Sequence, residues 1–172
     1  MSDFLNVETE ISDAITTLSI EARRFKKVSN NETLDILEKM QSRFLTRKAN
    51  HWWWEHFSGS RYALRLRDDM AYKRLDSLTP VSDQPLFFVA QERLADNWGF
   101  IIYLVENIDL IQNVISECSG FEYYVVPKNL DWLICENHHG VLIGISEAVV
   151  KQFQQYVILH PDEILEAREV LP

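Results

Sequence analysis

Five short apolar runs between residues 85 and 147 limit the possible folds of this chain more than any other feature. Each run is shorter than a typical buried helix and is bounded by Gly, Pro, Asn or Asp, which is typical of β-strands. The first two runs, residues 85–92 and 99–106, are expected to pair as a hairpin, and two more are hinged on residues 137–140. We therefore predict four or five strands in this half of the chain.

Segments whose apolar residues follow helical spacing precede and follow these runs. Apolar side chains recur at alternating steps of three and four over residues 4–25 and again over 34–45, which predicts two amphipathic helices joined as a hairpin. A third helix is expected to begin after Asn107, a good N-cap, and a fourth over residues 146–156. Pro161 suits the first turn of a last short helix, which we expect to follow it.

Together these elements predict an α+β fold, in which an N-terminal helical pair packs on a mostly antiparallel sheet of four to six strands. The fold of residues 51–69 is left open, because this aromatic and arginine-rich stretch follows no clear period. No repeat or linker interrupts the sequence, and 172 residues is an ordinary size for one domain. We therefore expect residues 1–172 to form a single domain.

Several classes of protein are disfavoured by composition. No uncharged apolar stretch approaches about 18 residues, and the N-terminus is acidic and polar, so we expect a cytoplasmic protein without a membrane span. Cys118 and Cys135 fit neither a metal-binding nor a disulfide spacing, which predicts buried, reduced thiols. Phosphate-binding loops, nucleophile elbows and dinucleotide-binding motifs do not occur, so no cofactor and no catalytic residue is predicted.

The two halves of the chain differ strongly in charge. Residues 1–81 contain 13 Lys and Arg against 12 Asp and Glu, whereas residues 82–172 contain 4 against 14, within a net charge of −9. This acidity disfavours binding to nucleic acid and to anionic membranes, because both require clustered Lys and Arg. It favours encounter with a basic protein, although solubility alone is an equally good explanation.

The turn at residues 135–140 concentrates side chains that enzymes use. Histidine can transfer a proton or bind a metal, and Glu136 could act as a base. Adjacent His138 and His139 would point to opposite faces of a strand, so no metal site is predicted. The alternative is a hairpin tip whose polar side chains satisfy backbone groups.

Three consecutive tryptophans, residues 52–54, cannot all face one core. An exposed tryptophan favours a protein interface or the stacking of a ligand, such as a carbohydrate or a base. The alternative is that the triplet wedges the helical pair onto the sheet. Trp98 and Trp132 are expected in the core or at its edge.

Residues 121–147, FEYYVVPKNLDWLICENHHGVLIGISE, resemble a signature of a family of small uncharacterised bacterial domains. The size, acidity and α+β composition are also similar to those of bacterial immunity proteins of contact-dependent inhibition and polymorphic-toxin systems. That resemblance implies a non-enzymatic protein that covers the active site of a basic toxin domain. The alternative is a small-molecule-binding protein or enzyme that uses the turn from Glu136 to His139. Candidate partner-binding residues are Glu106, Asp109, Glu122, Asp131, Glu136, His138, His139 and Trp53.

Overall fold

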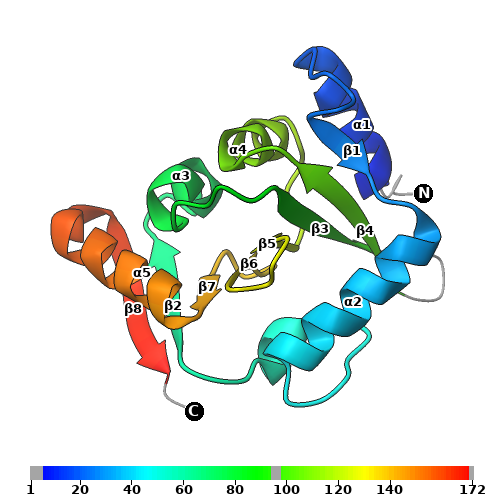
Figure 1. The fold of residues 1–172 in the computed structure, drawn as a ribbon. Coiled ribbons are helices and arrows are strands. Elements are labelled where there is room, and N and C mark those ends of the chain that lie inside the picture. The colour runs from blue at the N-terminus through cyan, green and yellow to red at the C-terminus, as the bar shows by residue number, and fades with distance from the viewer. Residues whose placement is uncertain (1–5, 94–97, 171–172) are drawn as a thin grey trace, which may run out of the picture.

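The computed structural model describes residues 6–93 and 98–170, and an antiparallel sheet of eight strands forms its centre. The strands are β1 (Phe25–Lys27), β2 (Arg61–Leu66), β3 (Leu86–Arg93), β4 (Trp98–Val105), β5 (Tyr123–Pro127), β6 (Leu133–Glu136), β7 (Leu142–Ile145) and β8 (Ile164–Val170). Their order across the sheet is β1-β4-β3-β5-β6-β7-β2-β8 (Figure 1). The predicted α+β class and antiparallel pairing are confirmed, but the sheet is larger than the expected four to six strands.

Helices cover both faces of the sheet. They are α1 (Val7–Thr17), α2 (Asn30–Phe44), α3 (Leu75–Leu78), α4 (Ile108–Ser116) and α5 (Glu147–Leu159), with short 3-10 turns η1 (Trp53–His56), η2 (Ala71–Arg74) and η3 (Pro161–Glu163). One core contains residues of α1, α3, α4 and α5, and the other contains residues of α2 and η1 (Figure 1). Successive residues of β3 alternate between them: Phe88 lies in the first core and Phe87 in the second. Both faces of this strand are therefore buried.

The expected N-terminal helical hairpin is wrong. The chain leaves α1 after Thr17, and Ser19 has a positive φ of 52°. Phe25, which continued the helical spacing, instead belongs to β1 and pairs with Val105 of β4. Because β1 separates the two helices, α1 packs on one face of the sheet and α2 on the other (Figure 1).

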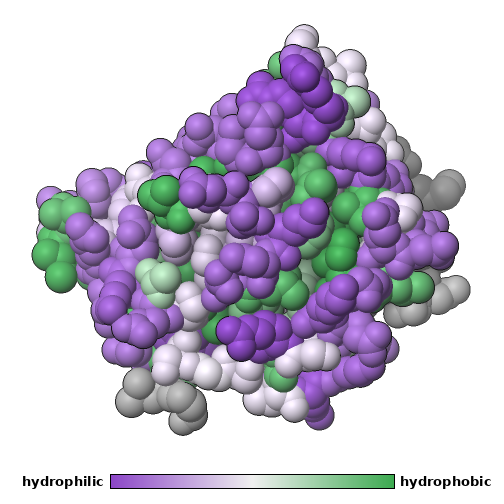
Figure 2. Space-filling model, in the orientation of Figure 1, coloured by the Kyte–Doolittle hydropathy of each residue, from purple (hydrophilic) through white to green (hydrophobic). Residues whose placement is uncertain are grey.

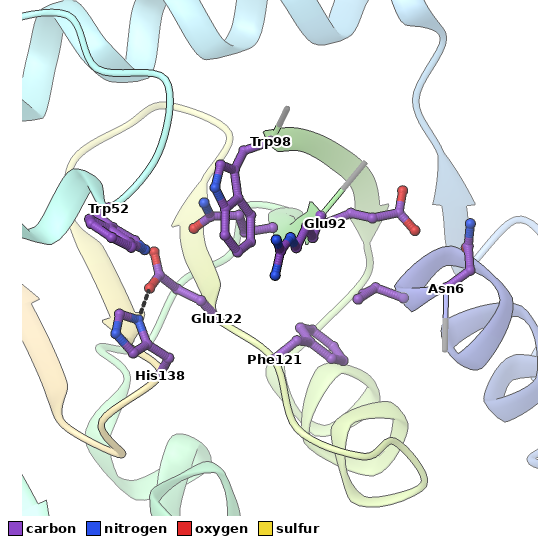
Figure 3. Close-up of a pocket in the computed structure, with 10 residues that line it drawn as sticks. Asn6, Trp52, Glu92, Trp98, Phe121, Glu122 and His138 are labelled. Atoms are coloured by element: carbon purple, nitrogen blue, oxygen red, sulfur yellow. Dashed lines mark hydrogen bonds and ion pairs between the residues drawn. The ribbon is translucent and has the colours of Figure 1, made fainter. Parts of the chain in front are cut away.

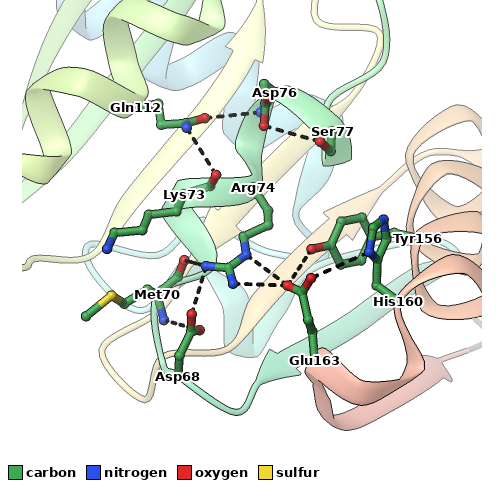
Figure 4. A network of polar contacts seen from close by, with 10 residues as sticks. All are labelled: Asp68, Met70, Lys73, Arg74, Asp76, Ser77, Gln112, Tyr156, His160 and Glu163. Atoms are coloured by element: carbon green, nitrogen blue, oxygen red, sulfur yellow. Dashed lines mark hydrogen bonds and ion pairs between the residues drawn. The ribbon is translucent and has the colours of Figure 1, made fainter.

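The last segment also differs from the prediction. Pro161 begins a single 3-10 turn, and β8 follows as an edge strand paired with β2, where a helix was expected. A polar network holds this turn in place (Figure 4). The Arg74 guanidinium lies 2.8 Å from an Asp68 oxygen and 3.0 Å from Glu163 Oε2, which also accepts the Tyr156 hydroxyl at 2.9 Å. These contacts direct the chain from α5 back along β2.

Other local predictions are confirmed. The β3–β4 pair forms the expected hairpin register, and β6 and β7 pair around the turn at residues 137–140. Asn107 caps α4 by accepting the Leu110 N–H at 3.1 Å, and Ser146 caps α5. In the described parts of the chain, no helix has the length and apolar character needed to cross a bilayer.

The surface is mainly hydrophilic in the orientation of Figure 2, with an apolar area at its left edge, over α5 and β8. Ile158 and Leu159 at the end of α5 and Leu165 on β8 are each more than half exposed. Single exposed apolar side chains are ordinary, and these three flank the edge of the sheet without entering either core. Further apolar side chains are visible in the middle of this view, between the helices, and the remaining surface is largely hydrophilic.

Close contact between α5 and β7 depends on Gly144. A Cβ atom added there would overlap Val149 Cγ1 and crowd the Phe153 ring, and both neighbours are fully buried. We expect Gly144→Ala to lower the free energy of unfolding by about 1–3 kcal/mol, the usual cost of overpacking a core. Urea unfolding measures this change. The double variant Gly144→Ala/Val149→Ala should lose less stability than the sum of the single variants, and strict additivity would contradict the proposed clash.

Candidate functional site

A pocket of about 390 Å³ lies at the end of the sheet where β3 runs past β5 (Figure 3). The paired residues of the two strands end at Ala90 and Tyr123, beyond which the Gln91 N–H still donates to the Glu122 carbonyl at 2.9 Å. The remainder of β3 has β4 on one side, and the pocket opens on the other. Its lining residues are Asn6, Val7, Trp52, Gln91, Glu92, Arg93, Trp98, Phe121, Glu122 and His138.

Glu122 makes several polar contacts in the pocket. Only 6% of the residue is exposed, and its carboxylate accepts hydrogen bonds from the Tyr124 hydroxyl and from Trp54 Nε1, the latter at 3.1 Å. His138 Nδ1 lies 3.2 Å from Glu122 Oε2 (Figure 3). Burial raises the pKa of Tyr124, with a further contribution from Glu122, so the hydroxyl stays protonated and donates the hydrogen bond. Glu122 thereby joins β5 to η1 and to the 137–140 turn.

Four rings form a continuous surface beside this carboxylate, called here the aromatic wall: Trp98, His51, Trp52 and His138. The His51 ring is stacked near Trp98 with centroids 6.1 Å apart and meets Trp52 edge-on at 4.7 Å. Trp52 in turn lies 5.8 Å from His138. Trp52 has a positive φ of 49° and is 37% exposed, so its indole stands at the mouth of the site.

The predicted cluster at the turn divides between the two faces of the sheet. Glu136 faces the core formed by α1, α3, α4 and α5, and its Oε2 accepts the Tyr123 hydroxyl at 2.5 Å. His138 faces the pocket, and His139 lies beside Trp54 with centroids 5.6 Å apart. Asn137 Oδ1 accepts the N–H groups of His139 and Val141, each at 3.1 Å, as expected for a satisfied hairpin tip.

The triplet of tryptophans divides between the core and the surface. Trp53 is fully buried, donates Nε1–H to the Ala49 carbonyl at 2.9 Å and contacts the Tyr124 and Phe100 rings. It therefore does not offer the surface anchor that we expected. The reason is that η1 turns the triplet so that the middle indole enters the core and Trp52 points outward.

The remaining acidic candidates do not gather on one surface. Glu106 pairs with Arg24 at 2.7 Å, and Asp109 is exposed in the first turn of α4. Asp131 lies in a separate hollow of about 600 Å³, which Glu147 and Glu169 also line. Of the expected partner-binding residues, the structure brings together only Glu122 and His138 in the pocket.

Sequence reasoning missed Gln91, Arg93 and Trp98 as pocket residues. Trp98, which we expect in the core or at its edge, is half-buried and lines the pocket. The available signal was the change from apolar to polar residues at Gln91, within a strand whose preceding residues are all buried. Gln91 and Glu92 are still buried, so this change places polar side chains inside the covered part of the strand.

Metal binding and thiol chemistry gain no support from the described residues. They contain no group of three or more His, Cys, Asp or Glu side chains arranged to hold a metal ion. Both cysteines are free. Burial raises the pKa of Cys118 to about 12 and that of Cys135 well above its usual range, which favours the protonated, unreactive form of each thiol.

The model of a family of unknown function, DUF6756, matches residues 3–157. The chain belongs to this family. The match includes residues 121–147 and confirms their resemblance to an uncharacterised domain family. No curated protein and no solved structure matches the chain.

Glu136 makes a testable contribution to stability. Burial raises its pKa, Asp69 raises it further and the Tyr123 hydroxyl opposes the shift, so the folded state disfavours the ionised form. Glu136→Gln should therefore be more stable than the wild type at neutral pH. Its advantage should shrink as the pH falls through the raised pKa towards the ordinary value of 4.5, because both folded and unfolded wild type are then protonated.

Urea unfolding at several pH values measures this difference. Glu147→Gln is the matched control, because the exposed Glu147 has its pKa lowered by Lys151 and should gain nothing at neutral pH. A Glu136→Gln variant that is less stable at neutral pH would contradict the expected penalty for the buried carboxylate.

Proposed function

We propose that this chain is a non-enzymatic binding protein whose ligand site is the pocket beside the aromatic wall. The observation that supports this best is convergence, because Trp52, Glu122 and His138 come from three separate segments and lie together at one concave site (Figure 3). Small-ligand sites commonly have volumes of roughly 300–1,000 Å³ and combine apolar walls with a few fixed polar groups. A pocket of about 390 Å³ has this character.

The polar groups of the pocket are suited to holding a ligand. Glu122 already accepts from two donors and contacts His138, so its carboxylate orients neighbouring side chains. Trp52 and Trp98 supply large rigid surfaces at low entropic cost, which is why tryptophan is enriched in binding sites. We therefore assign contact with the ligand to the Trp52 and Trp98 rings, and the orientation of neighbouring side chains to Glu122.

A thermal-shift panel of nucleosides, amino acids, monosaccharides and polyamines tests this proposal. One class should raise the melting temperature, since a ligand present at 100 times its Kd stabilises a protein by about 2.7 kcal/mol. Trp52→Asn should abolish the shift, because it removes the indole while Asn tolerates the positive φ at this position. Leu34→Asn, on an exposed position of α2, is the control and should retain it. A full shift in Trp52→Asn, or no shift with any class, would contradict the proposal.

Docking of a basic protein is a second candidate function, as implied by the similarity to immunity proteins. It is favoured by Asp131, Glu147 and Glu169, which come from three segments and line one hollow of about 600 Å³ that also contains Arg43. Carboxylates arranged around an open hollow attract Lys and Arg side chains and increase the rate of encounter. In this role the chain would block a toxin domain by covering its active site.

Affinity capture from host lysate at low salt, followed by binding kinetics with the basic protein recovered, tests the second candidate. Asp131→Asn/Glu169→Gln should slow association severalfold, and the difference should shrink in high salt because screening weakens exposed charges. Asp83→Asn, an exposed acid outside the hollow, is the matched control. Association that is unaffected by both the double variant and salt would exclude the hollow as the docking site.

A further inference from the structure

Gln91 is the pocket residue that the fold does not explain. Only 3% of the residue is exposed, and neither Oε1 nor Nε2 has a hydrogen-bond partner among the described residues. A buried amide without partners destabilises a protein, and native structures contain few of them. The buried Gln91 amide therefore offers one free donor group and one free acceptor to a ligand in the pocket that it lines.

The position of Gln91 on β3 makes its polarity unexpected. Alternation along the strand places it on the same face as Phe87 and Val89, which are buried in the core shared with α2. Its N–H donates to the Glu122 carbonyl, so the backbone is fixed and the side chain lines the pocket. An apolar residue would satisfy this environment at lower cost.

The hydrogen-bonding groups of the Gln91 amide indicate which ligand groups could pair with it. A glutamine side chain presents one acceptor and one donor side by side in a plane, so a planar ligand with an adjacent donor and acceptor satisfies both atoms. Glutamine reads the amino and N7 edge of adenine in this bidentate manner. The nearby Trp52 and Trp98 indoles offer faces on which a heterocycle can stack.

Charge narrows the ligand further. Glu92 and Glu122 line the pocket together with Arg93, and the chain as a whole carries a net charge of −9. This field repels phosphate groups and nucleic acid but leaves an uncharged ring unaffected. The same two carboxylates are compatible with a ligand that donates an amino hydrogen.

We infer that the pocket binds an uncharged planar heterocycle of the purine type, as a free base or nucleoside. This inference rests on the proposed function. The Gln91 amide pairs with the donor and acceptor edge of this heterocycle, and the aromatic wall that contains Trp52 and Trp98 contacts the ring. The proposal concerns binding alone, and no bond of the ligand is made or broken.

Isothermal titration with adenosine tests this inference in Gln91→Met, which keeps the length of the side chain and removes both polar amide atoms. Binding should weaken at least about tenfold, the usual discrimination of a bidentate contact. The melting temperature should stay unchanged or rise, because an unpaired buried group has been removed. Purine riboside, which lacks the exocyclic amino donor, should bind the wild type more weakly than adenosine does.

Thr79→Val is the matched control. Thr79 Oγ1 is also buried without a partner in the described chain, but Thr79 lies outside the pocket. This variant should gain or keep stability and should bind adenosine as the wild type does. If the Gln91 amide has a structural role instead, Gln91→Met should lose stability while Thr79→Val does not. That result would overturn the inference.

Other outcomes separate this inference from the proposed function. Equal adenosine affinity in Gln91→Met, or tighter binding of adenosine monophosphate than of adenosine, would overturn the inference. If adenosine does not bind but arginine or spermidine gives a thermal shift that Trp52→Asn abolishes, the inference fails and the proposed function stands. If no compound gives a Trp52-dependent shift, both fail.

Discussion

Burial of the sheet on both faces is the constraint on which the rest of this structure depends. Every residue of β5, β6 and β7 is buried, since α5 and α4 cover one side and α2 with η1 covers the other. In such a layer the strand ladder satisfies the backbone, and each side chain must be apolar or find a partner nearby. The constraint is strictest where layers touch most closely, which is why β7 has a glycine beneath α5. At the end of β3 the ladder with β5 stops after Ala90, and the pocket lies there, lined by the buried Gln91 and Glu92.

Two buried carboxylates show how the layer accepts charge. Glu136 lies directly opposite Tyr123 on the neighbouring strand and accepts its hydroxyl, while Glu122 accepts the hydroxyl of Tyr124 on the other face. The hydroxyls of adjacent tyrosines on one strand therefore donate hydrogen bonds to carboxylates on opposite faces of the sheet. The arrangement also explains why the turn at residues 137–140 is not one catalytic cluster. Strand alternation directs Glu136 into the core, whereas the turn brings His138 to Glu122.

The sequence predicted those elements whose local signals agreed with their tertiary environment. The β3–β4 hairpin, α4 with its Asn107 cap and the β6–β7 pair all have apolar runs bounded by turn or cap residues. It did not predict β1, whose first residue, Phe25, continues the apolar spacing of α1, or β8, whose half-exposed sequence follows a helix-favouring proline. Both are edge strands and owe their conformation to pairing with distant β4 and β2. The pocket was missed for the same reason, because Gln91, Trp52 and Glu122 are far apart in sequence.

Charge links the two candidate functions without making them equivalent. An exposed acidic surface attracts a basic protein over roughly a Debye length, about 8 Å at physiological ionic strength, and salt weakens that attraction. A neutral heterocycle in the pocket experiences little of this field, so its affinity depends on stacking and on the unpaired Gln91 amide, which salt affects little. The excess of carboxylates can therefore repel competing anions from the pocket while attracting cations to the Asp131 hollow. Salt dependence is the physical property that distinguishes binding at the two sites.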